Sequence, residues 1–170
     1  QGPEVAKFEE EFAKMCGVKY AVATSNGTTA GHLVMIASGI SPGDEVITTP
    51  FTFFATASVI IMAGAKPVFV DVEEDGFCLD PNQVESAITE KTKAIQPVHL
   101  YGELADMPSL AEISDKNNLV LIEDSAQAHS ADSWEGKAGS FGNAGWFSFY
   151  PTKNMTTSEG GIITTNSEGL

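Results

Sequence analysis

The chain has 170 residues, of which 42% are hydrophobic and 19% are charged, and this length suits one domain with a substantial core. Its formal net charge of −14 argues against binding to nucleic acid, because phosphate backbones require clusters of lysine and arginine. The sequence shows neither an apolar run long enough to span a membrane nor a signal-peptide pattern, so we expect a cytoplasmic protein that acts without a membrane.

Short apolar runs alternate with helical patterns along the chain. The first helical pattern, at residues 4–15, places Val5, Phe8 and Phe12 on one face and ends before Gly17. Apolar runs predict seven strands, at residues 20–23, 45–48, 67–70, 94–98, 119–122, 146–148 and 162–165. Further helical patterns lie between most of them, at residues 30–38, 55–63, 81–89 and 107–117. This alternation predicts an α/β fold, a three-layer α/β/α arrangement around a mainly parallel seven-stranded sheet.

The residues that directly follow the predicted strands are the first candidates for a site. In open parallel sheets, ligands bind outside the carboxyl ends of the strands. The segments at these positions are SNGTT at 25–29, PFTF at 50–53, HLYG at 99–102, DSAQ at 124–127 and SFYPTK at 148–153. Together they contain few acidic residues and a single lysine, Lys153.

The segment SNGTTAG follows the first predicted strand and opens a helix. Free backbone N–H groups and the helix dipole make such a turn an anion site, and the hydroxyls of Thr28 and Thr29 add donors. Gly27 allows the backbone to approach a ligand closely. Simple N-capping by serine or threonine explains the same residues equally well, so the motif alone leaves both interpretations open. It is not a phosphate-binding Walker A loop, because no GK[ST] follows.

Three further residues suggest chemistry at the strand ends. Asp124, at the end of LVLIED, is open to three interpretations: a helix cap, a metal ligand, or a carboxylate that pairs with a pyridinium nitrogen. Lys153 lies between an aromatic stretch and a Gly-Gly pair, which favours a cleft, where desolvation leaves a neutral amine that can form a Schiff base. Phe53 is by default a core residue, although an aromatic side chain there could stack on a planar ring.

Five motifs occur in one order with matching spacing: SNGTTAG, GDEVITTPFTFFATA, VHLYG, IEDSAQAH and SFYPTKNMTTSEGG. In these motifs the chain resembles the DegT/StrS-type sugar aminotransferases, which are fold-type-I pyridoxal-phosphate enzymes, from about Pro3 to its end. The resemblance implies an aspartate-aminotransferase-like large domain. Residues 1–170 would be its cofactor-binding core, and the C-terminal part of the large domain and the small domain would be absent.

The resemblance also implies roles for matching positions. Lys153 would bind pyridoxal 5'-phosphate through its amine and later shuttle protons, and Asp124 would pair with the pyridine nitrogen, so both are expected to be catalytic. The other expected cofactor contacts are Phe53 on the ring face, Gln127 near the ring hydroxyl, and Thr28, Thr29 and Ser148 on the phosphate.

The chain departs from the family pattern at a few positions. Glu103 stands where the family often has glutamine, and Ser130 and Ser158 stand where glycine is common, which affects loop shape more than chemistry. His99 and His129 are interpreted as hydrogen-bonded structural histidines, because no metal-ligand spacing surrounds them. The two cysteines form no disulfide framework, which indicates a reducing compartment.

The function implied by the resemblance is transfer of an amino group from an amino acid, glutamate or glutamine, to a nucleotide-linked keto sugar by a homodimer. A sugar dehydratase of the same family is an alternative, but those enzymes carry histidine in place of the lysine, and Lys153 argues against it.

Two further alternatives are not catalytic functions of this family. A non-catalytic module that binds cofactor weakly, or a scaffold, stays open because the substrate-side residues of the second domain are absent. A plain nucleotide-binding domain would require GxGxxG after the first strand, which SNGTTAG does not supply. Because the substrate-side residues of the second domain are absent, we expect residues 1–170 alone to bind pyridoxal phosphate at best and to be a poor aminotransferase.

Overall fold

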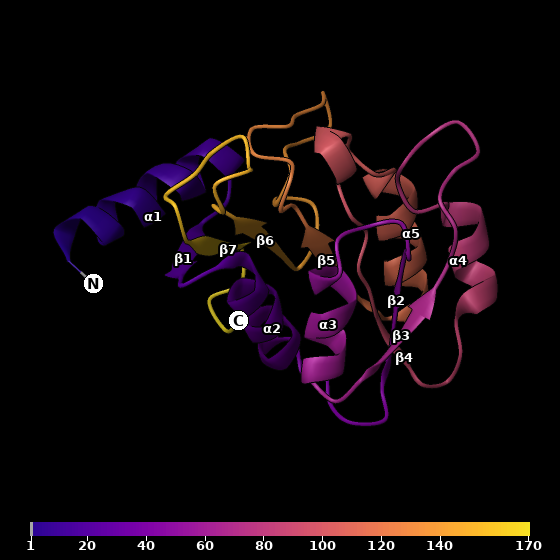
Figure 1. Cartoon of the computed structure of the whole chain (residues 1–170). Coiled ribbons are helices and arrows are strands. Elements are labelled where there is room, and N and C mark those ends of the chain that lie inside the picture. The colour runs from indigo at the N-terminus through magenta and orange to yellow at the C-terminus, as the bar shows by residue number, and fades with distance from the viewer. Residues whose placement is uncertain (1) are drawn as a thin grey trace.

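The structure, a computed structural model, describes residues 2–170 and contains one seven-stranded sheet in the order β1-β7-β6-β5-β4-β2-β3 (Figure 1). The strands are β1 (Tyr20–Thr24), β2 (Glu45–Thr48), β3 (Lys66–Phe69), β4 (Thr92–Ile95), β5 (Val120–Asp124), β6 (Ala144–Ser148) and β7 (Gly161–Thr165). The helices are α1 (Pro3–Cys16), α2 (Gly27–Ala37), α3 (Ala55–Met62), α4 (Pro81–Ala87) and α5 (Met107–Asn117), with a 3₁₀ turn, η1 (Leu100–Gly102).

The sheet is mainly parallel, as the sequence predicts, with one reversed strand. From β6 through β5, β4 and β2 to β3, all neighbours run parallel, whereas β7 runs antiparallel to both β1 and β6. Because of this reversal, the first residue of β7, Gly161, lies beside the last residues of its neighbours, Thr24 and Ser148. Residues near the start of β7 therefore share an edge with the carboxyl ends of the parallel strands.

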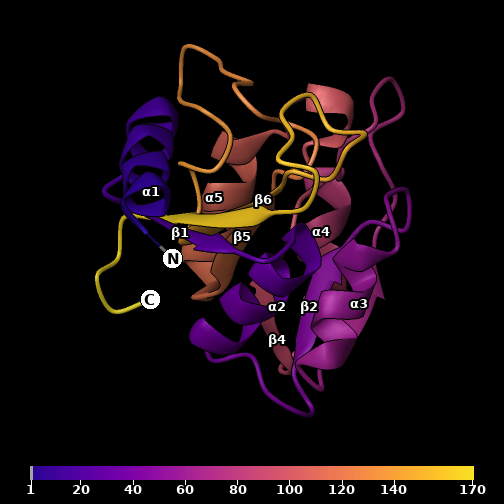
Figure 2. The same cartoon turned by 60° about the vertical axis from the view of Figure 1, so that its left-hand side comes forward.

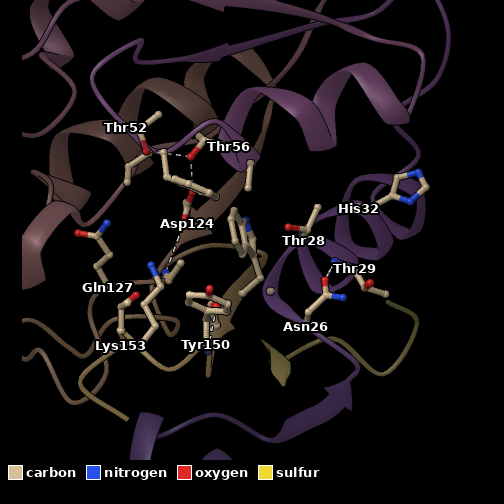
Figure 3. A pocket seen from close by; sticks show the side chains of 18 of the residues that line it. Asn26, Thr28, Thr29, His32, Thr52, Thr56, Asp124, Gln127, Tyr150 and Lys153 are labelled. Atoms are coloured by element: carbon tan, nitrogen blue, oxygen red, sulfur yellow. Dashed lines mark hydrogen bonds between the residues drawn. The ribbon is translucent and has the colours of Figure 1, made fainter. Parts of the chain in front are cut away.

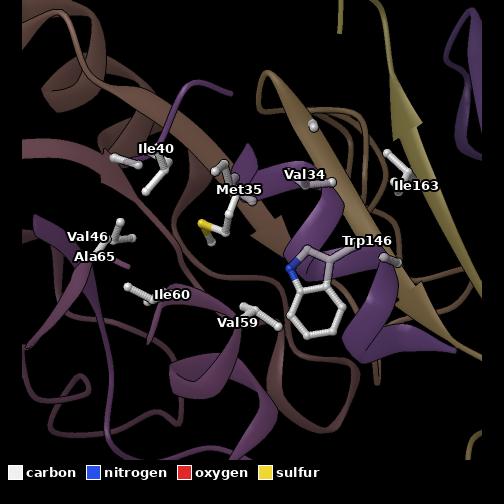
Figure 4. Packing of buried hydrophobic residues seen from close by; sticks show 13 residues of the cluster. Val34, Met35, Ile40, Val46, Val59, Ile60, Ala65, Trp146 and Ile163 are labelled. Carbon is white, nitrogen blue, oxygen red and sulfur yellow. The ribbon is translucent and has the colours of Figure 1, made fainter. Parts of the chain in front are cut away.

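Helices cover both faces of the sheet and complete the predicted three-layer architecture. Alternate residues of a strand point to opposite faces. Trp146 therefore packs with α2 and α3 (Figure 4), while its neighbour Phe147 packs with α1 on the other face. A separate cluster of buried hydrophobic residues packs α4 and α5 onto the same face of the sheet as α1, and it includes Ile95 of β4 and Leu121 of β5. Figure 2 shows α2 and α3 on one side of the sheet and α5 on the other.

Most predicted boundaries differ from the observed ones by one or two residues, and two larger differences have an identifiable cause. The helix predicted at 30–38 begins at Gly27, because the side chain of Asn26 caps it by accepting the N–H of Thr29 at 2.8 Å. The strand predicted at 94–98 ends at Ile95, and beyond it only Val98 forms an isolated bridge to Asp124. The intervening Pro97 has no N–H to contribute to a ladder.

Glu123 fixes the loop that precedes β6. Its side chain is fully buried, and its carboxylate accepts hydrogen bonds from the backbone N–H groups of Gly139, Phe141 and Gly142 at 2.7, 2.8 and 2.7 Å. A buried carboxylate is tolerated where several donors compensate for its lost hydration. These hydrogen bonds join the end of β5 to the loop that contains Gly139, Phe141 and Gly142. The pattern of apolar residues in the sequence does not predict this contact.

His99 is a hydrogen-bonded structural histidine, as the sequence predicts. It is fully buried, and its Nδ1 accepts the N–H of Ala105 at 3.1 Å. The proton therefore resides on Nε2, which donates to Glu123 at 3.0 Å. The backbone N–H of His99 also donates to the carbonyl of Asp124 at 3.0 Å, so this histidine ties the segment after β4 to the end of β5.

Other expectations concern metals, cysteines and membranes. Among residues 2–170, no group of histidine, cysteine and carboxylate side chains could hold a metal ion, and no helix has the length and apolarity needed to cross a membrane. Cys16 and Cys78 are buried free thiols. Burial raises the pKa of the Cys16 thiol to about 12 and that of Cys78 to about 11, which keeps both protonated near neutral pH.

The substitution Glu123→Gln tests the role of this carboxylate in the fold. We expect it to destabilise the chain by about 3 kcal/mol, because an amide replaces the charge and turns an N–H donor toward backbone N–H groups. Urea unfolding measures the effect, with the exposed Glu135→Gln as the matched control. Equal unfolding midpoints for the two variants would contradict the assignment.

Candidate functional site

A cavity of about 710 Å³ opens where the carboxyl ends of β5 and β6 face the N-termini of α2 and α3 (Figure 3). Its walls come from the segments that follow β1, β2, β5 and β6, which are four of the five that the strand-end argument selects. All seven side chains selected from the sequence line it: Thr28, Thr29, Phe53, Asp124, Gln127, Ser148 and Lys153. The structure thus brings these residues together, while their individual roles stay predictions.

The N-terminus of α2 forms one end of the pocket. A Cβ added at Gly27 would lie 2.6 Å from the Cβ of Ser148, so only glycine allows the helix to start this close to β6. This close approach brings the hydroxyl of Ser148 to the first residue of α2, and Thr28 and Thr29, which follow it, also line the pocket. The first N–H groups of a helix have no partner within it, so hydroxyls and backbone donors converge on a place suited to an anion.

Gly161 explains how the reversed strand contributes to the same end of the pocket. A Cβ at this position would lie 2.4 Å from the carbonyl oxygen of Asn26, the capping residue of α2. The start of β7 therefore packs directly under the turn that aims α2 at the pocket. Sequence reasoning used this glycine only as a marker near Lys153 and missed the contact, because it depends on the direction of β7.

Asp124 lies at the base of the pocket with 2% of its surface exposed. One carboxylate oxygen accepts the hydroxyl of Thr56 at 2.7 Å, and the other accepts the N–H of Ala126 at 3.1 Å. Burial raises the pKa of Asp124 to about 6, against the opposing effect of these two bonds and of the positive charge of Lys153. It caps no helix, so of its three interpretations the partner of a cationic group fits best.

Lys153 reaches the pocket from the segment after β6. Figure 3 shows its side chain on one side of the pocket and Thr28 on the other. Desolvation lowers the pKa of Lys153, and the negative charge of Asp124 opposes that shift. The backbone N–H of Lys153 donates to the carbonyl of Tyr150 at 2.9 Å, which closes the turn that carries the lysine.

Two reciprocal hydrogen bonds hold the lysine segment against the loop after β5. The Nδ1 of His129 lies 2.7 Å from Oδ1 of Asn154, and Nδ2 of Asn154 donates to the carbonyl of His129 at 3.1 Å. Burial lowers the pKa of His129, so its ring is neutral and Nδ1–H is the donor to Asn154. His129 is therefore a structural histidine, and it positions the residue next to Lys153.

Gln127 and Phe53 lie at the opening of the pocket. Gln127 is oriented by its Oε1, which accepts the backbone N–H of Tyr101 at 3.0 Å. The default assignment of Phe53 to the core is wrong, since 67% of this side chain is exposed. It projects from the turn between β2 and α3, where the chain has left the sheet and no helix covers it. Its exposed ring is free to contact a ligand at the mouth of the pocket.

Sequence reasoning missed the residues that support Asp124. Thr56 and Thr52 line the pocket and join Asp124 in a chain of hydrogen bonds (Figure 3). Thr52 belongs to the PFTF segment and Thr56 lies three residues beyond it, and that position is the only signal available in the sequence. Tyr150, Thr152 and Glu159 also line the pocket around Lys153.

The chain matches a known family over its whole length. The model of the DegT/DnrJ/EryC1/StrS aminotransferase family matches residues 1–170. The chain is 52% identical to a pleiotropic regulatory protein of Geobacillus stearothermophilus and 48% identical to a GDP-perosamine synthase of Caulobacter vibrioides. Each match covers 99% of this chain and 46% of the relative, so the chain spans about half the length of these curated relatives.

Solved structures agree with this match. The crystal structure of NtdA from Bacillus subtilis with its bound cofactor PMP superimposes with a TM-score of 0.93 at 36% sequence identity. The superposition covers 99% of this chain and 38% of that one.

The raised pKa of Asp124 predicts a pH-dependent contribution to stability. Because this pKa is about 6 in the folded chain and 3.8 ordinarily, the fold favours the protonated carboxyl. Its stabilising contribution is therefore complete below pH 3.8 and is lost as the pH rises through about 6. From about pH 4 to about pH 7, the unfolding free energy of the wild type relative to Asp124→Asn should fall by about 3 kcal/mol.

Chemical denaturation across this pH range measures that difference. The exposed Asp75→Asn, on the loop between β3 and α4, is the matched control. A difference between wild type and Asp124→Asn that stays constant with pH would show that burial does not shift this carboxyl.

Proposed function

Because the chain belongs to the DegT/DnrJ/EryC1/StrS aminotransferase family, we propose that it is the cofactor-binding core of a sugar aminotransferase that uses pyridoxal 5'-phosphate. The observation that carries the proposal is the convergence of three groups in one pocket. A lysine amine with a lowered pKa, a buried carboxylate and a hydroxyl-lined helix N-terminus meet there, at Lys153, Asp124 and the start of α2. Family membership alone would not indicate where the cofactor binds.

The residues present fit the parts of this cofactor. A phosphate suits the anion site at the start of α2, where Thr28, Thr29 and Ser148 would hold it. The exposed ring of Phe53 supplies a stacking surface, and Gln127 a polar group near a ring hydroxyl. When bound, pyridoxal phosphate supplies an electron sink for the charge left on carbon after a proton is removed.

Lys153 has the properties required of the residue that attaches the cofactor and moves protons. Burial lowers its pKa and so increases the fraction of neutral amine, which is the form that attacks an aldehyde carbon and accepts a proton. The hydrogen-bonded pair of His129 and Asn154 fixes the segment that carries it. The same lysine disfavours the sugar dehydratase alternative.

Asp124 would keep a ring nitrogen protonated. A cation at hydrogen-bonding distance favours the ionised carboxylate, so a pyridinium would draw the pKa of Asp124 down from about 6. In the buried base of the pocket, where little water competes, this charge pair gains strength. The carboxylate in turn holds the positive charge that makes the ring an effective electron sink.

The substrates and the assembly are inferred from the relatives. The amino acceptor in this proposal is a nucleotide-linked keto sugar, consistent with the similarity to a GDP-perosamine synthase, and the donor is glutamate or glutamine. Phe53, Phe54 and Tyr101 expose 67%, 75% and 69% of their surfaces near the pocket. Apolar surface of this kind favours association, which supports a homodimer that covers the site.

The substitution Lys153→Ala tests the proposed function. We expect it to abolish the absorbance change on covalent attachment of pyridoxal phosphate to residues 1–170, because the variant lacks the amine that attacks the aldehyde carbon. Visible absorbance provides the readout, since residues 1–170 alone are expected to be a poor aminotransferase. The exposed Lys91→Ala is the control, and retention of the absorbance change in Lys153→Ala would refute the role.

A further inference from the structure

Thr56 joins the start of α3 to the end of β5 through its hydroxyl. It lies in the first turn of α3 with 1% of its surface exposed. No earlier turn of this helix supplies a backbone carbonyl for the hydroxyl. It donates to Oδ2 of Asp124 at 2.7 Å. The contact joins two elements that are 68 residues apart in sequence.

The number of hydrogens fixes the direction of the bonds around Thr56. Its hydroxyl also lies 2.8 Å from that of Thr52, and geometry alone permits either of the two to donate. Thr56 has one hydroxyl proton, and an ionised Asp124 can only accept. With Asp124 charged, Thr52 must therefore donate to Thr56 and Thr56 to Asp124. Protonation of Asp124 on this oxygen would allow the whole chain to reverse.

Gln96 fixes the position of Thr56. Its side-chain Nε2 donates to the backbone carbonyl of Thr56 at 2.9 Å, and Gln96 itself is fully buried. The backbone carbonyl of Gln96 accepts the hydroxyl of Thr48, at the end of β2, at 2.8 Å. The start of α3 has no side-chain cap of its own, so this contact with the segment after β4 places the donor.

The two oxygens of Asp124 are thus each held by a donor from a different direction. Thr56 occupies Oδ2 from α3, and the N–H of Ala126 occupies Oδ1 from the turn after β5. Two bonds fix the plane of the carboxylate, and each oxygen retains a lone pair for a further donor. The other charged or titratable groups that act on Asp124 are Lys153 and His99.

We propose that Thr56, oriented by Thr52 and Gln96, is a positioning residue that keeps Asp124 ionised and in a fixed plane for a cationic ring nitrogen. The proposal rests on the proposed function for the identity of that ring. Thr56 is the strongest of the groups that oppose the effect of burial on the pKa of Asp124, ahead of Ala126 and Lys153. A hydrogen bond to the charged form favours that form.

Substitutions at Thr56 test the proposal through the titration of Asp124 in the cofactor-free protein. Thr56→Val keeps the shape but removes the donor, whereas Thr56→Ser retains it. Aspartate labelled with ¹³C at the carboxyl allows the titration to be followed by NMR, and Asp124→Asn assigns the signal. We expect Thr56→Val to raise the pKa of Asp124 by about one unit or more and Thr56→Ser to leave it close to the wild-type value.

Thr52→Val provides a second test that does not disturb the core, since Thr52 is only half-buried. It should raise the pKa of Asp124 in the same direction by a smaller amount, because Thr56 keeps its donor but loses its orientation. An unchanged titration in both valine variants would overturn the proposal, as would an equal shift in Thr56→Ser and Thr56→Val.

The titration separates this proposal from the proposed function. It requires no cofactor, so a missing shift in the valine variants overturns the role of Thr56 whatever the protein binds. A protein that shows the shift but fails to bind pyridoxal phosphate would instead refute the proposed function and leave the hydrogen-bond chain to Asp124 supported.

Discussion

Two adjacent carboxylates at the end of β5 organise both the scaffold and the pocket. Because side chains of a strand alternate between faces, Glu123 points toward the α1 and α5 side and Asp124 toward α3. Glu123 is saturated by three backbone N–H groups and His99, so it locks the chain around it. Asp124 receives two donors and retains capacity for a ligand. One strand end thus supplies a rigid anchor and, one residue later, a charge available for binding.

The other end of the pocket depends on close backbone approach. Gly27 allows α2 to begin against Ser148, and Gly161 allows the reversed β7 to pack beneath the cap of that helix. A Cβ at either position would overlap its neighbour, and the hydroxyls that line the anion site would move apart. The anion site at one end of the pocket and the buried carboxylate at its base together suit an elongated ligand. Such a ligand would carry a negative group at one end and a cationic nitrogen in its ring.

The sequence predicted the strand-end segments because parallel strands bring their carboxyl ends to one edge whatever the loops do. That rule placed Asp124, Ser148 and Lys153 in one pocket. It could not predict the direction of β7, since both directions give the same apolar pattern. It also missed the hydrogen bond from Thr56 to Asp124, because the partners are distant in sequence and threonine in an apolar helix reads as a core residue. For Phe53, composition alone favoured the core, whereas the turn that carries it leaves 67% of the side chain exposed, and the family resemblance implied contact with a ligand.

The central claim is that Lys153 carries the cofactor at the site defined by Asp124 and the start of α2. Reduction with borohydride after incubation with pyridoxal phosphate makes the covalent link permanent, and peptide mass spectrometry then identifies the modified residue. We predict that the added mass of the reduced cofactor lies on the peptide containing Lys153, and that excess inorganic phosphate lowers its yield by competing at the anion site. Modification of a different lysine, or of none, would contradict the account.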